Sequence, residues 1–462
     1  MTKTDLQQAL PRFQQFMNRF GPLLEDDTRV ARADAYLRGL LLDADDNKNA
    51  ETIALNAYGD DPSQVRMTQY FLGQSPWPYL PLRHELARWV NEDFGDDEGI
   101  LIIDESGFAK CGDKSVGVAR QYCGATGKID NCQIGVFLVY ASRHGHTLLD
   151  SRLYLPEEEW ANNLPRRQLA GVPEEVVFRT KPELAAELLL GTGQKLRHRW
   201  VTFDEGYGKD PVFLSRLEEA DQTYIGEVPK SVRAWLERPE VEQPGATGKG
   251  RPRSKPRVRA DQPAAQTVAQ IAAALPAKAW QRLTFREGSK GVQQAEFARV
   301  RVVVERDDLP GPELWLVVER SLDQEPKIKY YLSNAAVETA LLKLVQVGHS
   351  RWPVEDCFLQ GKQEVGLDAY EVRGWLGWHH HVTLVMLALW FLKLETQRLE
   401  KKATDGITLP DVRRLLQVLL GPEPPQDPQQ QALDLSAWRQ RRNRRARECH
   451  AKARLQRLRR TG

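Results

Sequence analysis

Cysteine is scarce in this sequence, with five residues in a chain of 462 and no Cys-x-x-Cys pair among them. The odd number argues against a disulfide framework and the spacing against a structural zinc site, so we expect a reducing, cytoplasmic setting. The first ten residues, MTKTDLQQAL, lack the apolar core of a secretion signal. Long hydrophobic runs are also missing. The longest, residues 382–392, is interrupted by Thr383 and is too short to span a bilayer, so we expect no membrane association.

An excess of one charge is absent too, because 65 Lys and Arg face 63 Asp and Glu and the formal net charge is only +2. The basic residues are nevertheless unevenly distributed. Within 249–259 they occupy every second position, as Lys249, Arg251, Arg253, Lys255, Arg257 and Arg259. Prolines between them favour an extended course that can follow the phosphates of double-stranded DNA. A solvated linker is the alternative. The segment after residue 438 contains eleven basic residues and one acid, which indicates a second nucleic-acid arm or a solubilising end.

Two short apolar runs each lead directly into an aspartate. Residues 100–103 (ILII) precede Asp104, and residues 200–203 (WVTF) precede Asp204. Such runs are typical of strands buried on both faces, and we expect these two to be neighbours in one sheet. A buried carboxylate is costly unless it is paired or holds a metal, so the repeated pattern indicates a site. For one such Asp alone, a turn or helix cap is the alternative.

A third acidic feature lies in residues 350–362, which we expect to be helical. Arg351, Glu355 and Lys362 stand at positions i, i+4 and i+11 and therefore share one helical face. Two strand-end aspartates and this glutamate predict a site for two divalent cations, and an all-oxygen donor set favours Mg²⁺. Arg351 and Lys362 are predicted to grip the DNA backbone.

Other polar groups compete with this interpretation less well. Glu105 and Glu205 each follow a key aspartate, and strand alternation turns them to the opposite face, whereas Glu364 and Asp368 are rivals to Glu355. The run His379–His381 suggests a metal site, but successive helical residues point about 100° apart and cannot all face one ion. We expect a packing role for them. No Ser-His-Asp set, Walker loop or dinucleotide fingerprint is evident.

Local patterns divide the chain into five parts. Residues 1–95 read as several short helices, either an N-terminal DNA-binding domain or a bundle that packs on the next domain. Residues 96–229 alternate strands and helices and form the first part of a catalytic core, an α/β mixed sheet with flanking helices. Residues 230–333 form a basic linker and a β-rich insertion. Residues 334–400 complete the core with the Glu355 helix, and 401–462 form a C-terminal helix and a basic tail.

Several blocks are shared with a known family. They are IIDESGFAK, SVGVARQYCG, FDEGYG and EVGLDAYEVRGW, together with the spacing of Arg351, Glu355 and Lys362. Over roughly residues 30–395 the sequence resembles the DDE-type transposases of bacterial insertion sequences. The match is best to the branch with a Tyr-x2-Arg-x3-Glu-x6-Lys motif. Gly348 stands at the tyrosine position, so one contact of the motif is missing here.

The resemblance implies a ribonuclease H-like core in which Asp104, Asp204 and Glu355 are catalytic and bind two Mg²⁺ ions, for which Mn²⁺ can substitute. It implies binding of terminal inverted repeats in DNA, strand cleavage and transfer to target DNA. In this branch an aromatic residue of the insertion can hold a flipped base, and Trp315 is the candidate, with sheet packing as the alternative. Synapsis of two DNA ends implies a homodimer on DNA, in a cytoplasmic, nucleoid-associated protein.

Two alternatives remain open at the level of sequence. One is a nuclease of the same fold that hydrolyses DNA without strand transfer. The other is a DNA-binding regulator whose active site is inactive, although the three acids Asp104, Asp204 and Glu355 are all present.

Overall fold

The computed structural model describes the chain except residues 1, 43–47, 60, 245–254, 289–290, 404–405, 422–435, 438–439, 442, 446, 450 and 453–462. The chain forms two compact units. Unit 1 comprises residues 1–82, 169–172 and 360–462, and unit 2 comprises 83–168 and 173–359. The N-terminal helices thus share a unit with the last helices of the chain. The five-part division of the sequence stays a prediction.

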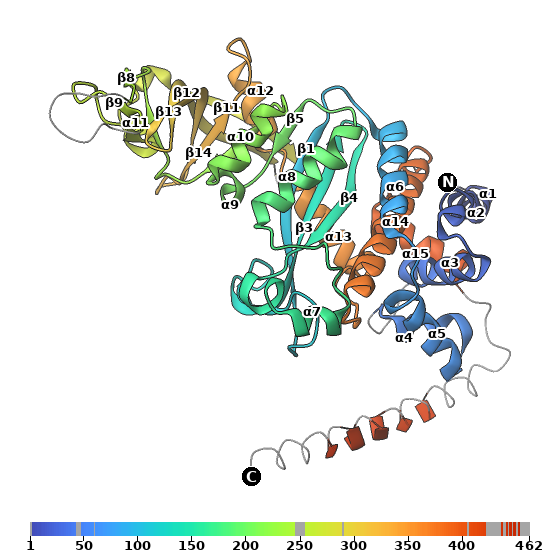
Figure 1. Cartoon of the computed structure of the whole chain (residues 1–462). Coiled ribbons are helices and arrows are strands. Elements are labelled where there is room, and N and C mark those ends of the chain that lie inside the picture. The colour runs from blue at the N-terminus through green and yellow to red at the C-terminus, as the bar shows by residue number, and fades with distance from the viewer. Residues whose placement is uncertain are drawn as a thin grey trace. The chain divides into compact units, whose positions relative to one another are not determined.

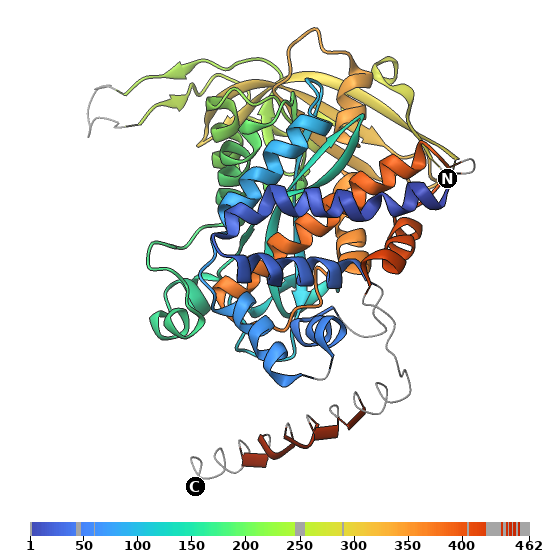
Figure 2. The ribbon, with the colours of Figure 1, turned by 90° about the vertical axis from the view of Figure 1, so that its right-hand side faces the viewer.

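Unit 1 is helical. Its helices are α1 (Lys3–Gln7), α2 (Ala9–Phe20), α3 (Asp27–Leu41), α4 (Ala50–Tyr58), α5 (Pro62–Gly73), α14 (Trp375–Glu400) and α15 (Leu409–Leu420), with a 3-10 turn at Gly21–Leu24. The long helix α14 is buried along most of its length and packs against α2, α3, α5 and α15 (Figure 2). Phe391 of α14 meets the rings of Phe13 and Phe16 edge-on, at centroid distances of 5.2 and 5.3 Å. Burial of these aromatic rings supplies much of the driving force for this packing.

The three histidines of α14 lie inside unit 1 and serve packing, as expected. Both ring nitrogens of His380 face carbonyl oxygens, of Leu72 at 2.8 Å and of Trp77 at 2.9 Å. His381 lies between the Tyr36 hydroxyl at 2.9 Å and the Gly366 carbonyl at 3.0 Å. These side chains therefore satisfy buried backbone and hydroxyl groups.

Three helices have residues in both units. They are α6 (Tyr79–Phe94), α7 (Leu164–Ala170) and α13 (Trp352–Val365). No helix among the described residues is both long and apolar enough to cross a membrane.

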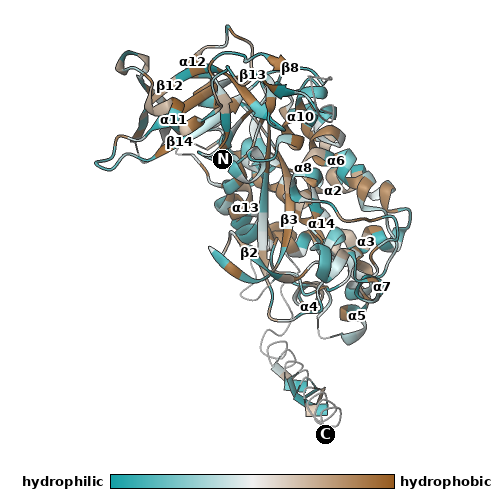
Figure 3. Ribbon diagram, turned by 60° about the vertical axis from the view of Figure 1, so that its left-hand side comes forward, coloured by the Kyte–Doolittle hydropathy of each residue, from teal (hydrophilic) through white to brown (hydrophobic). Residues whose placement is uncertain are grey.

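The first sheet of unit 2 is mixed. It contains β1 (Ile100–Ala109), β2 (Ala119–Cys123), β3 (Lys128–Ser142), β4 (Gly145–Leu153) and β5 (Trp200–Thr202). The order is β2-β3-β1-β5, and β4 also pairs with β3 (Figure 1). Strand β1 is antiparallel to β3 and parallel to β5, so the two predicted strands are indeed neighbours. Strand β3 is buried from Cys132 to Ala141 and is coloured apolar over much of its length in Figure 3.

Strand β1 corrects one expectation, because it does not end at Asp104. It continues to Ala109, since β3 pairs with it as far as the partners Ala109 and Cys132. Strand β5 stops much earlier, with Thr202 opposite Ile102. Asp104 therefore lies two residues past the last residue that β5 covers. The carboxylate is at an open edge of the sheet although its own strand goes on.

Helices α8 (Lys181–Gly191), α9 (Glu205–Gly208) and α10 (Pro211–Glu219) follow the first sheet. Helix α8 packs on β3 and β4, and α10 packs on α8. Thr180 and Glu183 form a capping box at the start of α8, and Pro182 occupies its first turn. Short π and 3-10 turns lie at Glu157–Ala161, Gly193–Lys195 and Ala277–Ala279.

The second sheet of unit 2 comes mainly from residues 230–333, which is β-rich as expected. Its strands are β6 (Ile225–Val228), β7 (Arg233–Trp235), β10 (Gln266–Thr267), β11 (Gln281–Gly288), β12 (Gly291–Arg306), β13 (Leu309–Arg320) and β14 (Ile328–Ser333). The order is β10-β7-β12-β13-β14-β6, with β11 beside β12. A parallel bridge between Val201 and Tyr224 links the two sheets. A separate pair, β8 (Val241–Glu242) and β9 (Arg257–Val258), flanks the undescribed residues 245–254.

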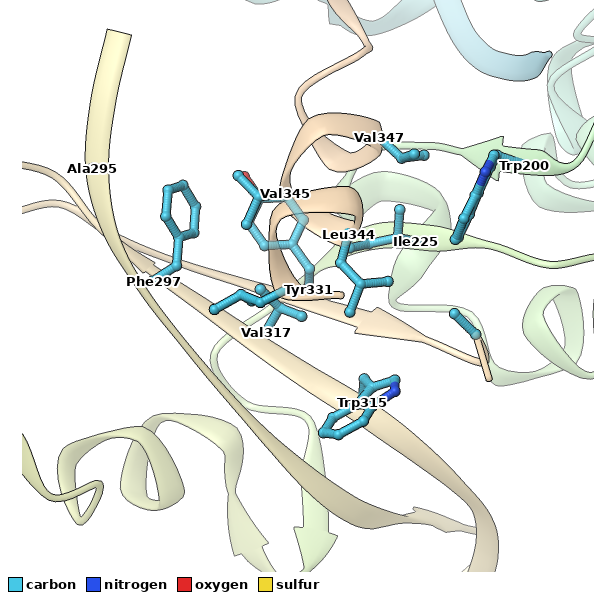
Figure 4. Packing of buried hydrophobic residues seen from close by; sticks show 12 residues of the cluster. Trp200, Ile225, Ala295, Phe297, Trp315, Val317, Tyr331, Leu344, Val345 and Val347 are labelled. Carbon is cyan, nitrogen blue, oxygen red and sulfur yellow. The ribbon is translucent and has the colours of Figure 1, made fainter. Parts of the chain in front are cut away.

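Each face of this second sheet carries its own core. Helix α12 (Leu341–Gly348) covers one face, where Phe297, Trp315 and Tyr331 pack with Leu344 (Figure 4). On the other face, α11 (Val268–Ala273) packs over alternate residues of β12, β13 and β14. The strict alternation between the two cores fixes the register of the long strands.

Candidate active site

Asp104 and Arg351 form the centre of a small charged cluster in unit 2. The Arg351 Nη2 atom lies 2.9 Å from Asp104 Oδ2, to which it donates a hydrogen bond, and 4.0 Å from Asp204 Oδ2. Asp104 comes from the middle of β1, Asp204 from the residues just after β5, and Arg351 from the turn before α13. The structure therefore brings together two carboxylates and one cation that are far apart in the sequence.

Asp104 is held in a buried setting. Its other oxygen, Oδ1, accepts a hydrogen bond from the Glu105 backbone N–H at 2.7 Å. Burial raises the pKa of Asp104 to about 6, the negative charge of Asp204 adds to the rise, and Arg351 opposes it. A carboxyl with such a pKa, next to a second acid, is typical of functional sites as well as of ion-pair networks.

Within the block FDEGYG, Asp204 and the two glycines account for the local fold. Asp204 caps the short helix α9, since its Oδ1 accepts a hydrogen bond from the Gly206 N–H at 2.9 Å. With Oδ1 used for this cap, the other carboxylate oxygen of Asp204, Oδ2, faces Arg351. A Cβ at position 208 would overlap the carbonyl of Glu227, so glycine lets α9 approach β6 closely. The helix-cap role considered for a lone Asp is thus real, and it also orients the carboxylate.

Glu355 is placed differently from the two aspartates. It lies in the first turn of α13, four residues after Arg351, and its side chain is exposed. The next residue, Asp356, has its Oδ2 atom 2.7 Å from His146 Nε2. Among the described residues, no group of three or more His, Cys, Asp and Glu side chains is arranged to hold a metal ion. The part that Glu355 plays in a triad therefore stays a prediction.

The residues predicted to contact DNA lie in different environments. Arg351 is engaged by Asp104 through Nη2, and its buried Nε has no hydrogen-bond partner among the described residues. Lys362 lies half-buried in α13. Trp315 is only 8 % exposed and its Nε1 donates to the Ala336 carbonyl at 3.2 Å, which supports the packing role. The basic strip Lys249, Arg251 and Arg253 lies outside the described residues.

Two side chains beside the cluster, Tyr207 and Lys181, were not predicted from the sequence. Tyr207 of α9 is 2 % exposed, and no hydrogen-bond partner of its hydroxyl is found in the described part of the chain. Glu105 forms an ion pair of 2.9 Å with Lys181 at the start of α8. The signal for Tyr207 was its place in the FDEGYG block, three residues after Asp204. For Lys181 no local signal existed.

The donor set suits a hard divalent cation. Asp104 and Asp204 offer only carboxylate oxygens, and both already face one positive group, the guanidinium of Arg351. A cation held by these two residues would take over the charge compensation that Arg351 now provides.

Residues 16–292 match the family model described as DDE superfamily endonuclease. The chain is also 36 % identical, over 160 residues, to a probable transposase for insertion sequence element IS701 of Microchaete diplosiphon. That match covers 34 % of this chain and 38 % of the relative, so the chain spans well under half of the relative's length.

Two solved structures are distantly similar to the chain. A piggyBac transposase synaptic complex with hairpin DNA has a TM-score of 0.43 and 10 % identity, over 89 % of this chain and 76 % of that one. The NurA nuclease from Sulfolobus solfataricus has a TM-score of 0.27 and 12 % identity, over 70 % of this chain and 93 % of that one.

Proposed function

This chain belongs to the DDE superfamily endonucleases, and from this premise we propose that it is the transposase of a bacterial insertion sequence. It binds the terminal inverted repeats of its element, cleaves DNA strands, and joins the freed 3′ hydroxyls to target DNA. Asp104, Asp204 and Glu355 are the catalytic acids and hold two Mg²⁺ ions. The observation that supports this most is the convergence of Asp104 and Asp204 around Arg351.

We place the catalytic residues on a ribonuclease H-like core. The antiparallel run β1-β3-β4, with β5 parallel to β1 on the other side, supports this assignment. Residues 230–333 are then an insertion between Asp204 and Glu355, which builds most of the second sheet. The insertion leaves the acids on elements that pack in one unit.

Each protein group has a definite task in this proposal. When bound, a pair of Mg²⁺ ions activates the attacking hydroxyl and stabilises the leaving oxygen. Asp104, from β1, and Asp204, from the turn after β5, would hold the cations, and Glu355 would complete the set from α13. Arg351 neutralises the two aspartates in the absence of metal, and with cations bound it would be available to the DNA phosphate.

The partners follow from the reaction. Two DNA ends must be processed together, so a homodimer supplies one site for each end. The basic strip at 249–259 and the basic segment after residue 438 supply sequence-independent contacts to phosphates, and Lys362 adds one from α13.

The test uses purified protein, Mg²⁺ and a DNA fragment that carries the inverted repeats found beside the gene. We expect Asp104→Ala and Glu355→Ala to lower the cleavage rate by roughly 10³-fold or more. Glu205→Ala is the matched control, because Glu205 is an exposed acid directly after Asp204, and it should keep the wild-type rate. Cleavage by either active-site variant at the wild-type rate would refute the assignment.

The products separate the alternatives. A transposase yields molecules with a new 3′–5′ joint between the element end and target DNA. A nuclease without strand transfer yields only cut ends. An inactive regulator binds the repeats with Mg²⁺ or Mn²⁺ present and cuts nothing.

A further inference from the structure

The hydroxyl of Tyr207 is an unexplained polar group beside the candidate active site. The side chain is 2 % exposed, and no hydrogen-bond partner of its oxygen is found in the described part of the chain. A buried hydroxyl without a partner is destabilising, and phenylalanine would fill the same space without that cost. The unsatisfied hydroxyl therefore indicates a hydrogen-bond partner in another state of the site.

The ring of Tyr207 is firmly positioned. It packs against Phe213, with ring centroids 6.0 Å apart, and α9 is held against β6 by the close approach at Gly208. The backbone N–H of Tyr207 donates to the Asp204 carbonyl at 3.1 Å. The hydroxyl therefore has a fixed place relative to Asp204 and cannot easily rotate away to find solvent.

Negative charges surround that place. Burial raises the pKa of Tyr207 well above its usual value, the charges of Glu105, Asp104 and Asp204 raise it further, and Arg351 lowers it. The phenol thus stays protonated and can act as a hydrogen-bond donor to a carboxylate. Its neighbours are the acids of the candidate active site and Glu105, which is paired with Lys181.

Three of the four carboxylate oxygens of Asp104 and Asp204 accept a hydrogen bond in this structure, and the fourth, Asp204 Oδ2, lies 4.0 Å from Arg351 Nη2. Asp104 Oδ1 accepts from the Glu105 N–H and Oδ2 accepts from Arg351, while Asp204 Oδ1 accepts from the Gly206 N–H. If a cation took the place of Arg351, the two carboxylates would reorient to share it, and a reoriented carboxylate would still have a lone pair for the Tyr207 hydroxyl.

Building on the function proposed above, we propose that Tyr207 is a positioning residue of the metal-bound site, whose hydroxyl donates to Asp104 or Asp204 when they hold cations. The hydrogen bond fixes one carboxylate in the orientation that binds metal, in the way that outer residues orient metal ligands elsewhere. Without metal, the hydroxyl contributes nothing to stability.

The test compares Tyr207→Phe with the wild type in the full-length protein. Free Mn²⁺ is titrated by electron paramagnetic resonance without DNA, and the melting temperature is measured in EDTA. We expect Tyr207→Phe to weaken Mn²⁺ binding 10-fold or more, as loss of an outer-shell partner does, and to leave the metal-free melting temperature equal or higher. A matched variant, Tyr330→Phe, removes the hydroxyl of a tyrosine that is 9 % exposed and whose pKa only burial raises, and it should bind Mn²⁺ like the wild type.

Two results would overturn the inference. One is wild-type Mn²⁺ affinity in Tyr207→Phe, and the other is a clear fall of its metal-free melting temperature, which would mean an ordinary structural hydrogen bond. Asp104→Asn, measured in parallel, keeps this outcome separate from the proposed function. If Asp104→Asn also binds Mn²⁺ normally, the carboxylate site itself is wrong. If only Tyr207→Phe is normal, the site stands and Tyr207 has no part in it.

Discussion

The guanidinium of Arg351 donates to Asp104 across 247 residues of sequence, at 2.9 Å, and lies 4.0 Å from Asp204. It is therefore the cation around which two acids of the candidate site are gathered. It offsets the effect of Asp204, whose negative charge raises the pKa of Asp104.

Replacing this cation tests the relationship directly. In Arg351→Met, the two carboxylates lose their partner, and we expect the metal-free protein to lose about 1–3 kcal/mol in its free energy of unfolding at pH 8. Urea unfolding in EDTA measures the loss. Added Mg²⁺ should restore part of it, because a divalent cation fits the same position. The matched control is Arg143→Met, a largely exposed arginine at 77 % whose loss should matter little. A loss that Mg²⁺ does not reduce would show that the pair is purely structural.

Asp104 makes stability depend on pH with a definite sign. Burial raises its pKa to about 6 from the ordinary 3.8, so the folded chain binds this proton more tightly than the unfolded chain does. The stabilisation is fully present below about pH 3.8 and disappears as the pH rises through about 6. Asp104→Asn removes the titration. Between pH 4.5 and 7.5 in EDTA, the free energy of unfolding of the wild type should therefore fall by roughly 2 kcal/mol relative to that of Asp104→Asn.

The control for that measurement is Asp97→Asn, since the Asp97 side chain is 88 % exposed. Its difference from the wild type should stay constant over the same range. A flat profile for Asp104→Asn would mean that the carboxyl titrates normally and that its burial is unimportant.

Asp204 has two roles that one substitution can separate. Its carboxylate caps α9 through the Gly206 N–H and also faces Arg351. Asparagine keeps the side-chain oxygen needed for the cap, so Asp204→Asn should change stability by less than about 1 kcal/mol. It removes the negative charge that a cation needs, so DNA cleavage should fall by roughly 10³-fold. Thermal unfolding and a cleavage assay on the same preparation give both numbers, and full activity in Asp204→Asn would reduce this residue to a cap.

Some elements of the fold can be predicted from the sequence alone. Helix α8 (Lys181–Gly191) can be read from local sequence, because its proline, capping residues and leucines all act within a few turns. The neighbouring strands of Asp104 and Asp204 were also anticipated, since an apolar run before an acid is a local pattern. Strand β11 (Gln281–Gly288) is harder to predict from local sequence, because most of its residues are polar and β12 supplies its hydrogen-bond partners.

Longer-range features were beyond local patterns. The end of β1 depends on its register with β3, and the partner of Arg351 depends on the fold of unit 2. Likewise, the pairing of Glu105 with Lys181 joins residues 76 positions apart. Such contacts arise from tertiary packing, which overrides the propensity of short segments.

His380 lies in the interior of unit 1. The two ring nitrogens of His380 lie 2.8 Å from the Leu72 carbonyl oxygen and 2.9 Å from the Trp77 carbonyl oxygen, and the tautomer decides which nitrogen donates. The ring also stacks on the Trp77 indole at a centroid distance of 3.6 Å. In His380→Phe the stacking is kept but a buried carbonyl loses its donor, and we expect a loss of about 1–3 kcal/mol in the free energy of unfolding.

The measurement is chemical unfolding, with His144→Phe as the control at an exposed histidine. Because His380 belongs to unit 1 and the acids Asp104 and Asp204 to unit 2, Mn²⁺ binding by folded His380→Phe should match the wild type. If His380→Phe instead weakened Mn²⁺ binding without lowering stability, the histidine run would have to be reconsidered as part of a metal site. The geometry argues against that, since each ring nitrogen of His380 already meets a backbone carbonyl.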